Sequence, residues 1–366
     1  MKRRLLLGAA VSLLAGAAAS PAQGGLLPPL LPPPNPEPQP PPPPPRAEPP
    51  RESRCISLTG PARAARPLFG CDFPDPMVLR VGRTYYAYGT SGHRGFFPIL
   101  RSGDLRHWRR AGNGFRAAPG WTRGHLWAPH VVRAGRGRYL MYYSARRREG
   151  IDHCLAVATS SRPWGPFAHR RVLACRDARS AGFIDPALLR VRRRAYLFFA
   201  VDGPFKSISA LRLSRDLMSV RGRRATLLGV TEPWQMGLRS ATIEAPAPVK
   251  RGKRYYLFHS AGCWCGDYRV GYAVARRPLG PYRYPARNPL LAHGRSGLSA
   301  PGSASLFRDR RRRLWMAFHA WSGPADYTKG GLRTLRLGRV RWRGRGRRTV
   351  ARVRLPRLRL TAPGTR

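Results

Sequence analysis

The sequence predicts an all-β fold, a five-bladed β-propeller, from two repeated features. An aromatic and β-branched strand recurs five times, at spacings of 54, 57, 59 and 60 residues between the equivalent positions Tyr85, Tyr139, Tyr196, Tyr255 and Trp315. A shorter strand and a basic or glycine-containing turn precede each copy, so each pair is predicted to form a hairpin. Multi-stranded units repeated at this period are typical of propeller blades. A two-sheet sandwich is the alternative, but it does not explain the regular period.

The strands of each unit can be placed in order along the chain. The five predicted hairpins cover residues 74–91, 127–145, 184–202, 244–261 and 302–321. Outer strands follow them and also repeat, because "LAVATSSRPWGPF" after the second hairpin matches "VGYAVARRPLGPY" after the fourth, and "LRSGDL" after the first resembles "LRLSRDL" after the third. Helical periodicity is nearly absent, which supports an all-β domain.

The two ends of the chain differ in composition from this domain. Residues 1–22 combine a basic start with an apolar run and small residues, and we expect a signal peptide and an extracellular, secreted protein. Residues 23–54 are rich in proline and are predicted to be a disordered linker. The propeller is expected over 55–345, followed by an Arg-rich tail or last strand over 346–366. No later apolar run approaches the ~18 residues of a membrane span.

The net charge of +51 comes from arginines scattered over every segment, since only five of the 68 basic residues are lysine. No recognition helix or zinc-ligand spacing accompanies the charge, so we expect no specific nucleic-acid partner. The charge leaves one function without catalysis open, namely that the protein is a propeller that binds anionic polymers.

Six cysteines in an exported chain indicate disulfides. Cys154 and Cys175 bracket two predicted strands and a turn, and we expect them to pair. The pairing of the other four cysteines stays open.

Three carboxylates recur at one place in the repeat. Asp75 lies ten residues before its unit's aromatic residue, and Asp185 and Glu244 each lie eleven before theirs, while Ala128 and Ala304 hold this place in the other two units. Because the first strand of every blade lines the central channel, the three acids are expected to converge.

Converging carboxylates suit the hydrolysis of a glycosidic bond, in which one acid protonates the leaving oxygen and another activates water. A third carboxylate can raise the pKa of the acid by like-charge repulsion. A calcium site is the competing use of clustered acids. It ranks second, because these acids are 110 and 59 residues apart.

The ordered motifs "FPDPMVLRVGRTYYAYGTS", "LWAPHVV", "CLAVATSSRPWGPF", "FIDPALL", "IEAPAPV" and "FHAW" resemble those of glycoside hydrolase family 43, which contains inverting arabinofuranosidases, arabinanases and xylosidases. The similarity extends from about Phe73 to Trp342. It implies a glycoside hydrolase acting on arabinose-containing plant polysaccharides, as an arabinofuranosidase or arabinanase, with a β-xylosidase as the alternative.

The resemblance also implies roles for individual residues. Asp75 would be the general base, Glu244 the general acid, and Asp185 the residue that orients the acid and tunes its pKa. Arg333 matches a substrate-binding arginine of the family. Independently of the resemblance, Trp127 adjoins Ala128 at the repeated position of the second unit and can stack on a sugar, with a core tryptophan packed between blades as the alternative. Inversion implies that acid and base stand roughly 6.5 to 9.5 Å apart.

One departure concerns metal binding. Many members carry "PGH" in the fifth unit, whereas this chain has "PGS", with Ser303 in place of the histidine. We therefore expect no cofactor to be required for the chemistry, and a structural calcium ion is in doubt. We expect a monomer that acts on a polysaccharide or oligosaccharide. The choice between arabinose and xylose, and between exo and endo cleavage, stays open.

Overall fold

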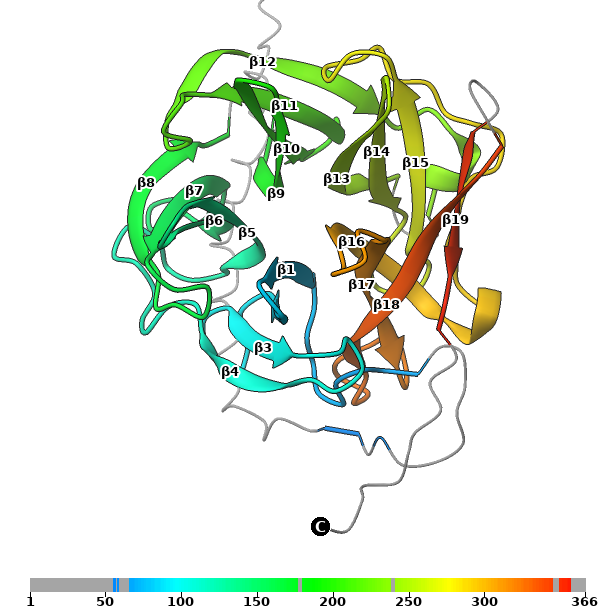
Figure 1. Cartoon of the computed structure of the whole chain (residues 1–366), viewed down its shortest axis with the longest axis horizontal. Helices are drawn as coiled ribbons and strands as arrows, with labels where there is room; N and C mark the ends of the chain where they lie inside the picture. The colour runs from blue at the N-terminus through cyan, green and yellow to red at the C-terminus, as the bar shows by residue number, and fades with distance from the viewer. Residues whose placement is uncertain are drawn as a thin grey trace, which may run out of the picture. The chain divides into compact units, whose positions relative to one another are not determined.

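The computed structural model describes residues 55–56, 58, 66–176, 180–237, 241–344 and 349–356. The predicted signal peptide (1–22), nearly all of the region before residue 66 and most of the segment 346–366 lie outside these residues. Within the described residues, five groups of antiparallel strands follow one another around a common axis (Figure 1). The predicted five-bladed β-propeller is confirmed.

Each blade is an antiparallel meander whose first strand lies nearest the axis (Figure 1). Blade 1 comprises β1 (Met77–Val81), β2 (Thr84–Tyr88), β3 (Pro98–Ser102) and β4 (Arg109–Asn113). Blade 2 comprises β5 (Trp127–Gly135), β6 (Arg138–Arg146), β7 (His153–Ser160) and β8 (Ala168–Ala174). Blade 3 comprises β9 (Gly182–Val191), β10 (Arg194–Asp202), β11 (Ser207–Leu213) and β12 (Val220–Gly229).

The last two blades complete the ring. Blade 4 comprises β13 (Ile243–Arg251), β14 (Arg254–Ala261) and β15 (Arg269–Ala275). Isolated bridges from β15 to Arg283 and Leu291 stand in place of a regular fourth strand. Blade 5 comprises β16 (Ser299–Arg308), β17 (Leu314–Ser322), β18 (Leu332–Arg343) and β19 (Val350–Arg354). The helices among the described residues are two short 3-10 turns, η1 (Pro233–Gln235) and η2 (Arg295–Gly297), and none is long and apolar enough to cross a membrane.

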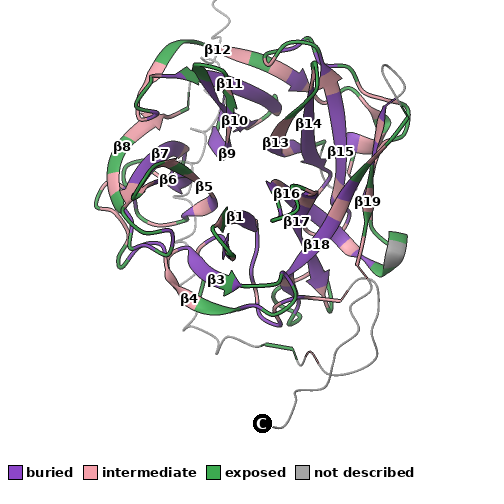
Figure 2. Ribbon diagram, viewed as in Figure 1, coloured by how far each residue is buried: buried purple, intermediate pink, exposed green. Residues whose placement is uncertain are grey.

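The core is divided among the interfaces between blades. Five separate clusters of buried apolar side chains lie between blades 1 and 2, 2 and 3, 3 and 4, 4 and 5, and 5 and 1. Alternate residues of a second strand therefore face opposite neighbours: in β10, Tyr196 and Phe198 pack toward blade 4, whereas Leu197 and Phe199 pack toward blade 2. Burial on both faces explains why these strands are almost continuously apolar in the sequence. Figure 2 shows the outer strands as more exposed.

Blade 5 is joined to blade 1 by packing and by backbone hydrogen bonds. The Leu68 N–H donates to the Leu335 carbonyl at 3.0 Å, and the Phe73 N–H donates to the Arg333 carbonyl at 2.8 Å. The segment that precedes β1 thus lies against β18, and it seals the ring without a covalent link.

Three disulfides join the six cysteines, and the predicted Cys154–Cys175 bond is among them. The other bonds, Cys55–Cys71 and Cys263–Cys265, settle the pairings that the sequence left open.

Candidate active site

A β-bulge occurs at the same place on the innermost strand of four blades. In each of these strands two consecutive residues lie opposite a single residue of the second strand. The first of the two residues has a positive φ, as does the residue at this place before β1, and the five residues are Asp75, Ala128, Asp185, Ala245 and Ser303. Side chains other than glycine rarely adopt this conformation, and such residues cluster at functional sites.

The bulges show that the spacing argument was wrong by one residue for Glu244. Strand pairing aligns Tyr256 of β14, rather than Tyr255, with Tyr196 of β10. The equivalent of Asp185 is therefore Ala245, and Glu244 comes one position earlier. The error arose because two tyrosines stand side by side in β14, so the aromatic marker could be set on either one.

Glu244 is instead equivalent to Trp127, since both directly precede the bulge of their strand. The fifth unit needs the same kind of correction, because Ser303 rather than Ala304 has the positive φ there. Asp75 and Asp185 therefore share one position of the repeat, and Glu244 occupies the position directly before it.

Asp75 is largely buried and is held by contacts from three directions. Its Oδ2 accepts a hydrogen bond from the Thr90 hydroxyl at 2.5 Å, its Oδ1 lies 3.6 Å from Arg333 Nη1, and its own N–H donates to His319 Nδ1 at 3.2 Å. Burial acts to raise the pKa of Asp75, but Arg333 and the Thr90 hydroxyl outweigh it and the pKa is lowered. Asp75 is therefore ionised at neutral pH.

His319 supports Asp75 without carrying charge. Burial, together with the nearby Arg333, lowers the pKa of His319 to about 3. The neutral ring can accept the Asp75 N–H through Nδ1, which places its proton on Nε2. The ring also stacks on Tyr268, with 5.8 Å between the ring centroids.

Asp185 has the opposite electrostatic setting. Burial raises its pKa well above the ordinary value, and the neighbouring charges of Glu244 and Asp75 raise it further. The Ala245 N–H, which donates to Asp185 Oδ2 at 2.9 Å, acts in the other direction and is the weaker influence.

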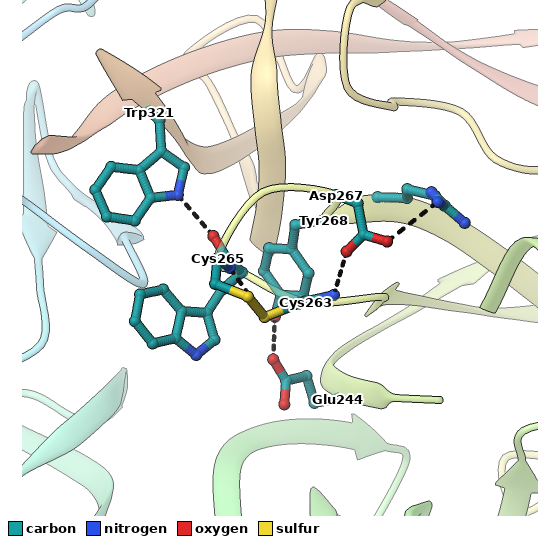
Figure 3. The surroundings of a disulfide bond; sticks show 8 residues. Glu244, Cys263, Cys265, Asp267, Tyr268 and Trp321 are labelled. Atoms are coloured by element: carbon teal, nitrogen blue, oxygen red, sulfur yellow. Dashed lines mark hydrogen bonds and ion pairs between the residues drawn. A yellow bond between two sulfur atoms is a disulfide. The ribbon is translucent and has the colours of Figure 1, made fainter. Parts of the chain in front are cut away.

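Glu244 also has a raised pKa. Burial is the main cause, and the charges of Asp202 and Asp75 contribute to it. The Tyr268 hydroxyl donates to Glu244 Oε1 at 2.6 Å, and with Lys206 it partly offsets the increase (Figure 3). Tyr268 in turn packs on β16 at Gly302, where an added Cβ would lie 1.8 Å from Tyr268 Cδ1.

The three acids thus share one electrostatic neighbourhood. Asp75 acts on the pKa of both Asp185 and Glu244, and all three acids act on Tyr268. Asp75 and Asp185 also line a central cavity of about 350 Å³, bounded by residues of the five innermost strands. This neighbourhood holds one carboxylate with a lowered pKa, Asp75, and two with raised pKa values, Asp185 and Glu244.

The two predicted substrate-binding residues lie on different blades. Arg333, on β18, is largely buried, and its Nε donates to the Tyr327 hydroxyl at 2.6 Å. Trp127 begins β5 and stacks on His153, with 4.0 Å between the ring centroids. It adjoins Ala128, whose N–H donates to the same Thr90 hydroxyl that binds Asp75.

Thr90 and Tyr268 were not predicted as site residues. Thr90 follows the first aromatic strand within "YGTS", where a polar residue after an apolar strand was the available signal. Tyr268 lies at the end of the loop between β14 and β15, two residues before the repeated segment that begins at Val270, and it was not singled out.

Among the described residues, the group of histidine, cysteine and acidic side chains close enough to hold a metal ion is Asp152, Cys154 and Cys175. The two cysteines are joined in a disulfide, and Asp152 supplies the group's one carboxylate. Calcium prefers several oxygen ligands. This group does not fit calcium.

Comparison with known proteins identifies the chain as a glycoside hydrolase. Residues 64–347 match the glycosyl hydrolases family 43, and the chain belongs to that family. The predicted family and enzyme class are thereby confirmed.

Three similar proteins illustrate the range of the family. A β-D-galactofuranosidase of Aspergillus niger is 25% identical over 289 residues, which cover 74% of this chain and 80% of that protein. An extracellular endo-α-(1→5)-L-arabinanase of Thermotoga petrophila is 29% identical over 256 residues, or 58% of this chain and 50% of that protein. The crystal structure of a thermostable family-43 glycoside hydrolase superposes with a TM-score of 0.70 at 27% identity, covering 81% of this chain and 97% of the other.

Proposed function

We propose that the protein is a secreted, inverting glycosidase that acts on arabinose-containing polysaccharides, as an α-L-arabinofuranosidase or arabinanase. The observation that carries the proposal is the opposite displacement of two pKa values in one site, lowered for Asp75 and raised for Glu244. A base must be ionised and an acid protonated at the same pH, and pairs of groups displaced in this way mark acid and base roles.

In this mechanism ionised Asp75 accepts a proton from a water molecule while the water oxygen attacks the anomeric carbon. Glu244 donates its proton to the glycosidic oxygen as the bond to the anomeric carbon breaks. Asp185 and Glu244 oppose each other's ionisation, so the pair retains a proton that Glu244 can donate. Attack opposite to the leaving group inverts the anomeric configuration.

Arg333 and Trp127 are proposed to bind the substrate. Arg333 lies beside Asp75 and can donate hydrogen bonds to sugar hydroxyls, and the flat ring of Trp127 can cover a sugar face. No cofactor is needed for these steps, and the active unit is proposed to be a monomer.

The sugar specificity rests on the relatives. One similar protein is named an arabinanase, and that protein is also named extracellular, which agrees with the signal peptide proposed at 1–22. The propeller is proposed to follow the linker at 23–54.

The proposal is tested with purified protein on linear arabinan and on aryl arabinofuranoside and aryl xyloside. We expect release of arabinose or arabino-oligosaccharides, with proton NMR showing inversion at the anomeric carbon. Faster hydrolysis of the xyloside would assign the enzyme as a β-xylosidase instead. Inactivity on all three substrates would refute both assignments.

The acid role is tested with Glu244→Gln. We expect turnover of arabinan to be lost, while an aryl arabinofuranoside with a good leaving group, which needs little protonation, keeps most of its rate. Equal losses on both substrates in a folded variant would remove Glu244 from the acid role.

A further inference from the structure

The short disulfide Cys263–Cys265 encloses one residue, Trp264, at the rim of the site. We propose that Trp264 is a sugar-stacking residue that the disulfide holds in place, so that oligosaccharide binding depends on the oxidised state of this bond. The inference rests on the proposed carbohydrate substrate and adds a binding element to that site.

The disulfide lies in the loop 262–268, which joins β14 to β15 (Figure 3). Within the loop, the Cys263 N–H donates to Asp267 Oδ1 at 2.7 Å, and Asp267 Oδ2 lies 3.3 Å from Arg269 Nη2. The base of the loop is thus held by hydrogen bonds and an ion pair. Its tip, which carries the tryptophan, is closed by the disulfide.

The loop contacts Glu244 directly and is linked to Asp75 through Arg333. At its end, the Tyr268 hydroxyl donates to Glu244. At its tip, the Trp264 ring lies against the Arg333 guanidinium, with 4.9 Å from Cζ to the ring centroid, and Arg333 faces Asp75 at 3.6 Å. A substrate that reaches Asp75 and Glu244 therefore lies within the span of this one loop.

Trp264 is held by its neighbours and remains partly exposed. The Trp321 ring is nearly parallel to it, at an interplanar angle of 18°, and donates from Nε1 to the Trp264 carbonyl at 2.6 Å. Trp321 is only 3% exposed, whereas Trp264 is 42% exposed and the adjoining Tyr327 is 38% exposed. Exposed aromatic rings next to a cationic, hydrogen-bonding group suit the apolar face and hydroxyls of a sugar ring.

The size of the disulfide loop indicates a local role. The stabilisation gained by closing a loop in the unfolded chain increases with the length of that loop. Sequence separations of 16 and 21 residues make Cys55–Cys71 and Cys154–Cys175 the larger contributors, whereas Cys263 and Cys265 are 2 residues apart. We therefore expect loss of this bond to loosen Trp264 while the propeller remains folded.

The first test replaces Trp264 with Ala and measures arabinotetraose and xylotetraose, both as substrates and by calorimetric binding to the Glu244→Gln protein. We expect roughly a tenfold weaker Kd and a higher KM for the preferred tetrasaccharide, with a smaller change in kcat, and recovery of most of the affinity in Trp264→Phe. Trp164→Ala is the matched control, because Trp164 is 43% exposed and lies in the turn between β7 and β8. It should leave Kd and KM unchanged.

The second test replaces Cys263 and Cys265 together with Ser. We expect Kd to weaken in the same direction as in Trp264→Ala, with the thermal midpoint nearly unchanged. A mild reductant should weaken tetrasaccharide binding by the parent protein to the same extent and should leave binding by the double variant unchanged.

Each other outcome counts against a defined part of the inference. Unchanged tetrasaccharide affinity in folded Trp264→Ala overturns the stacking role. If Trp264→Ala weakens the affinity but the double serine variant does not, the role of the disulfide is overturned. A parent protein that binds neither tetrasaccharide overturns the whole inference. Absence of hydrolysis with Trp264-dependent binding refutes the proposed function and leaves the inference standing, so the two failures are distinguishable.

Discussion

Replacing Tyr268 with Phe removes the hydroxyl that donates to Glu244 Oε1 at 2.6 Å while keeping the buried ring. This hydrogen bond favours the ionised carboxylate, so its loss raises the pKa of Glu244 further. A hydrogen bond to a charged group contributes about 1.5–3 kcal/mol. One pKa unit corresponds to about 1.36 kcal/mol, so the expected increase is about one to two units.

The assay is the pH dependence of kcat/KM on an aryl arabinofuranoside. Because the acid must be protonated, the alkaline limb reports its pKa and should move to higher pH by about one to two units in Tyr268→Phe. Tyr142→Phe is the matched control, since that buried hydroxyl donates to the Leu217 carbonyl and is outside the site. An alkaline limb that stays in place, or moves to lower pH, would refute the assignment of Glu244 as the acid tuned by Tyr268.

Three further changes have defined outcomes. Asp185→Asn removes one of two buried carboxyls that resist ionising together, so the alkaline pKa of kcat/KM should fall. The pKa of Asp185 is higher in the folded protein than in the unfolded chain, so the folded state loses stability as pH rises through the folded-state pKa. Asp185→Asn removes this loss. In calorimetric scans the variant should therefore have a higher Tm than the parent protein at pH 7 but not at pH 3. Thr90→Val removes the hydroxyl that donates to ionised Asp75, so the pKa of Asp75 should rise and the acidic limb of kcat/KM should move to higher pH. The Ala128 N–H also loses its acceptor, and the free energy of unfolding in urea should fall by about 1–3 kcal/mol. Gly302→Ala places a Cβ against Tyr268 and should lower stability by about 1–3 kcal/mol or more, and an unchanged Tm would show that the ring can move aside.

The fold could be predicted because burial on both faces leaves a direct trace in the sequence. Each second strand needs large apolar side chains on alternate sides, so the aromatic strand returns once per blade. The period was therefore visible without knowledge of any contact. Asp75 and Asp185 were placed at equivalent positions, as their shared positive φ shows, although the marker Tyr85 stands one residue before the true equivalent of Tyr196.

The details of the site were less accessible for equally physical reasons. Glu244 was placed one position off, because Tyr255 and Tyr256 stand side by side and only strand pairing shows that Tyr256 is the equivalent of Tyr196. Tyr268 lies in the loop between β14 and β15, and its contact with Glu244 of β13 arises only when the three strands of blade 4 have come together. Charges at large sequence separation, such as Arg333 beside Asp75, came from family resemblance alone.

The seam between Leu68 and Leu335 has a consequence for how the enzyme matures. Two stretches from opposite ends of the propeller sequence must meet before the circle is complete, and contacts of such long range form late and slowly. The candidate active site takes residues from all five blades, so a partly synthesised chain cannot complete it. We expect activity to appear only after the last blade has docked against the first.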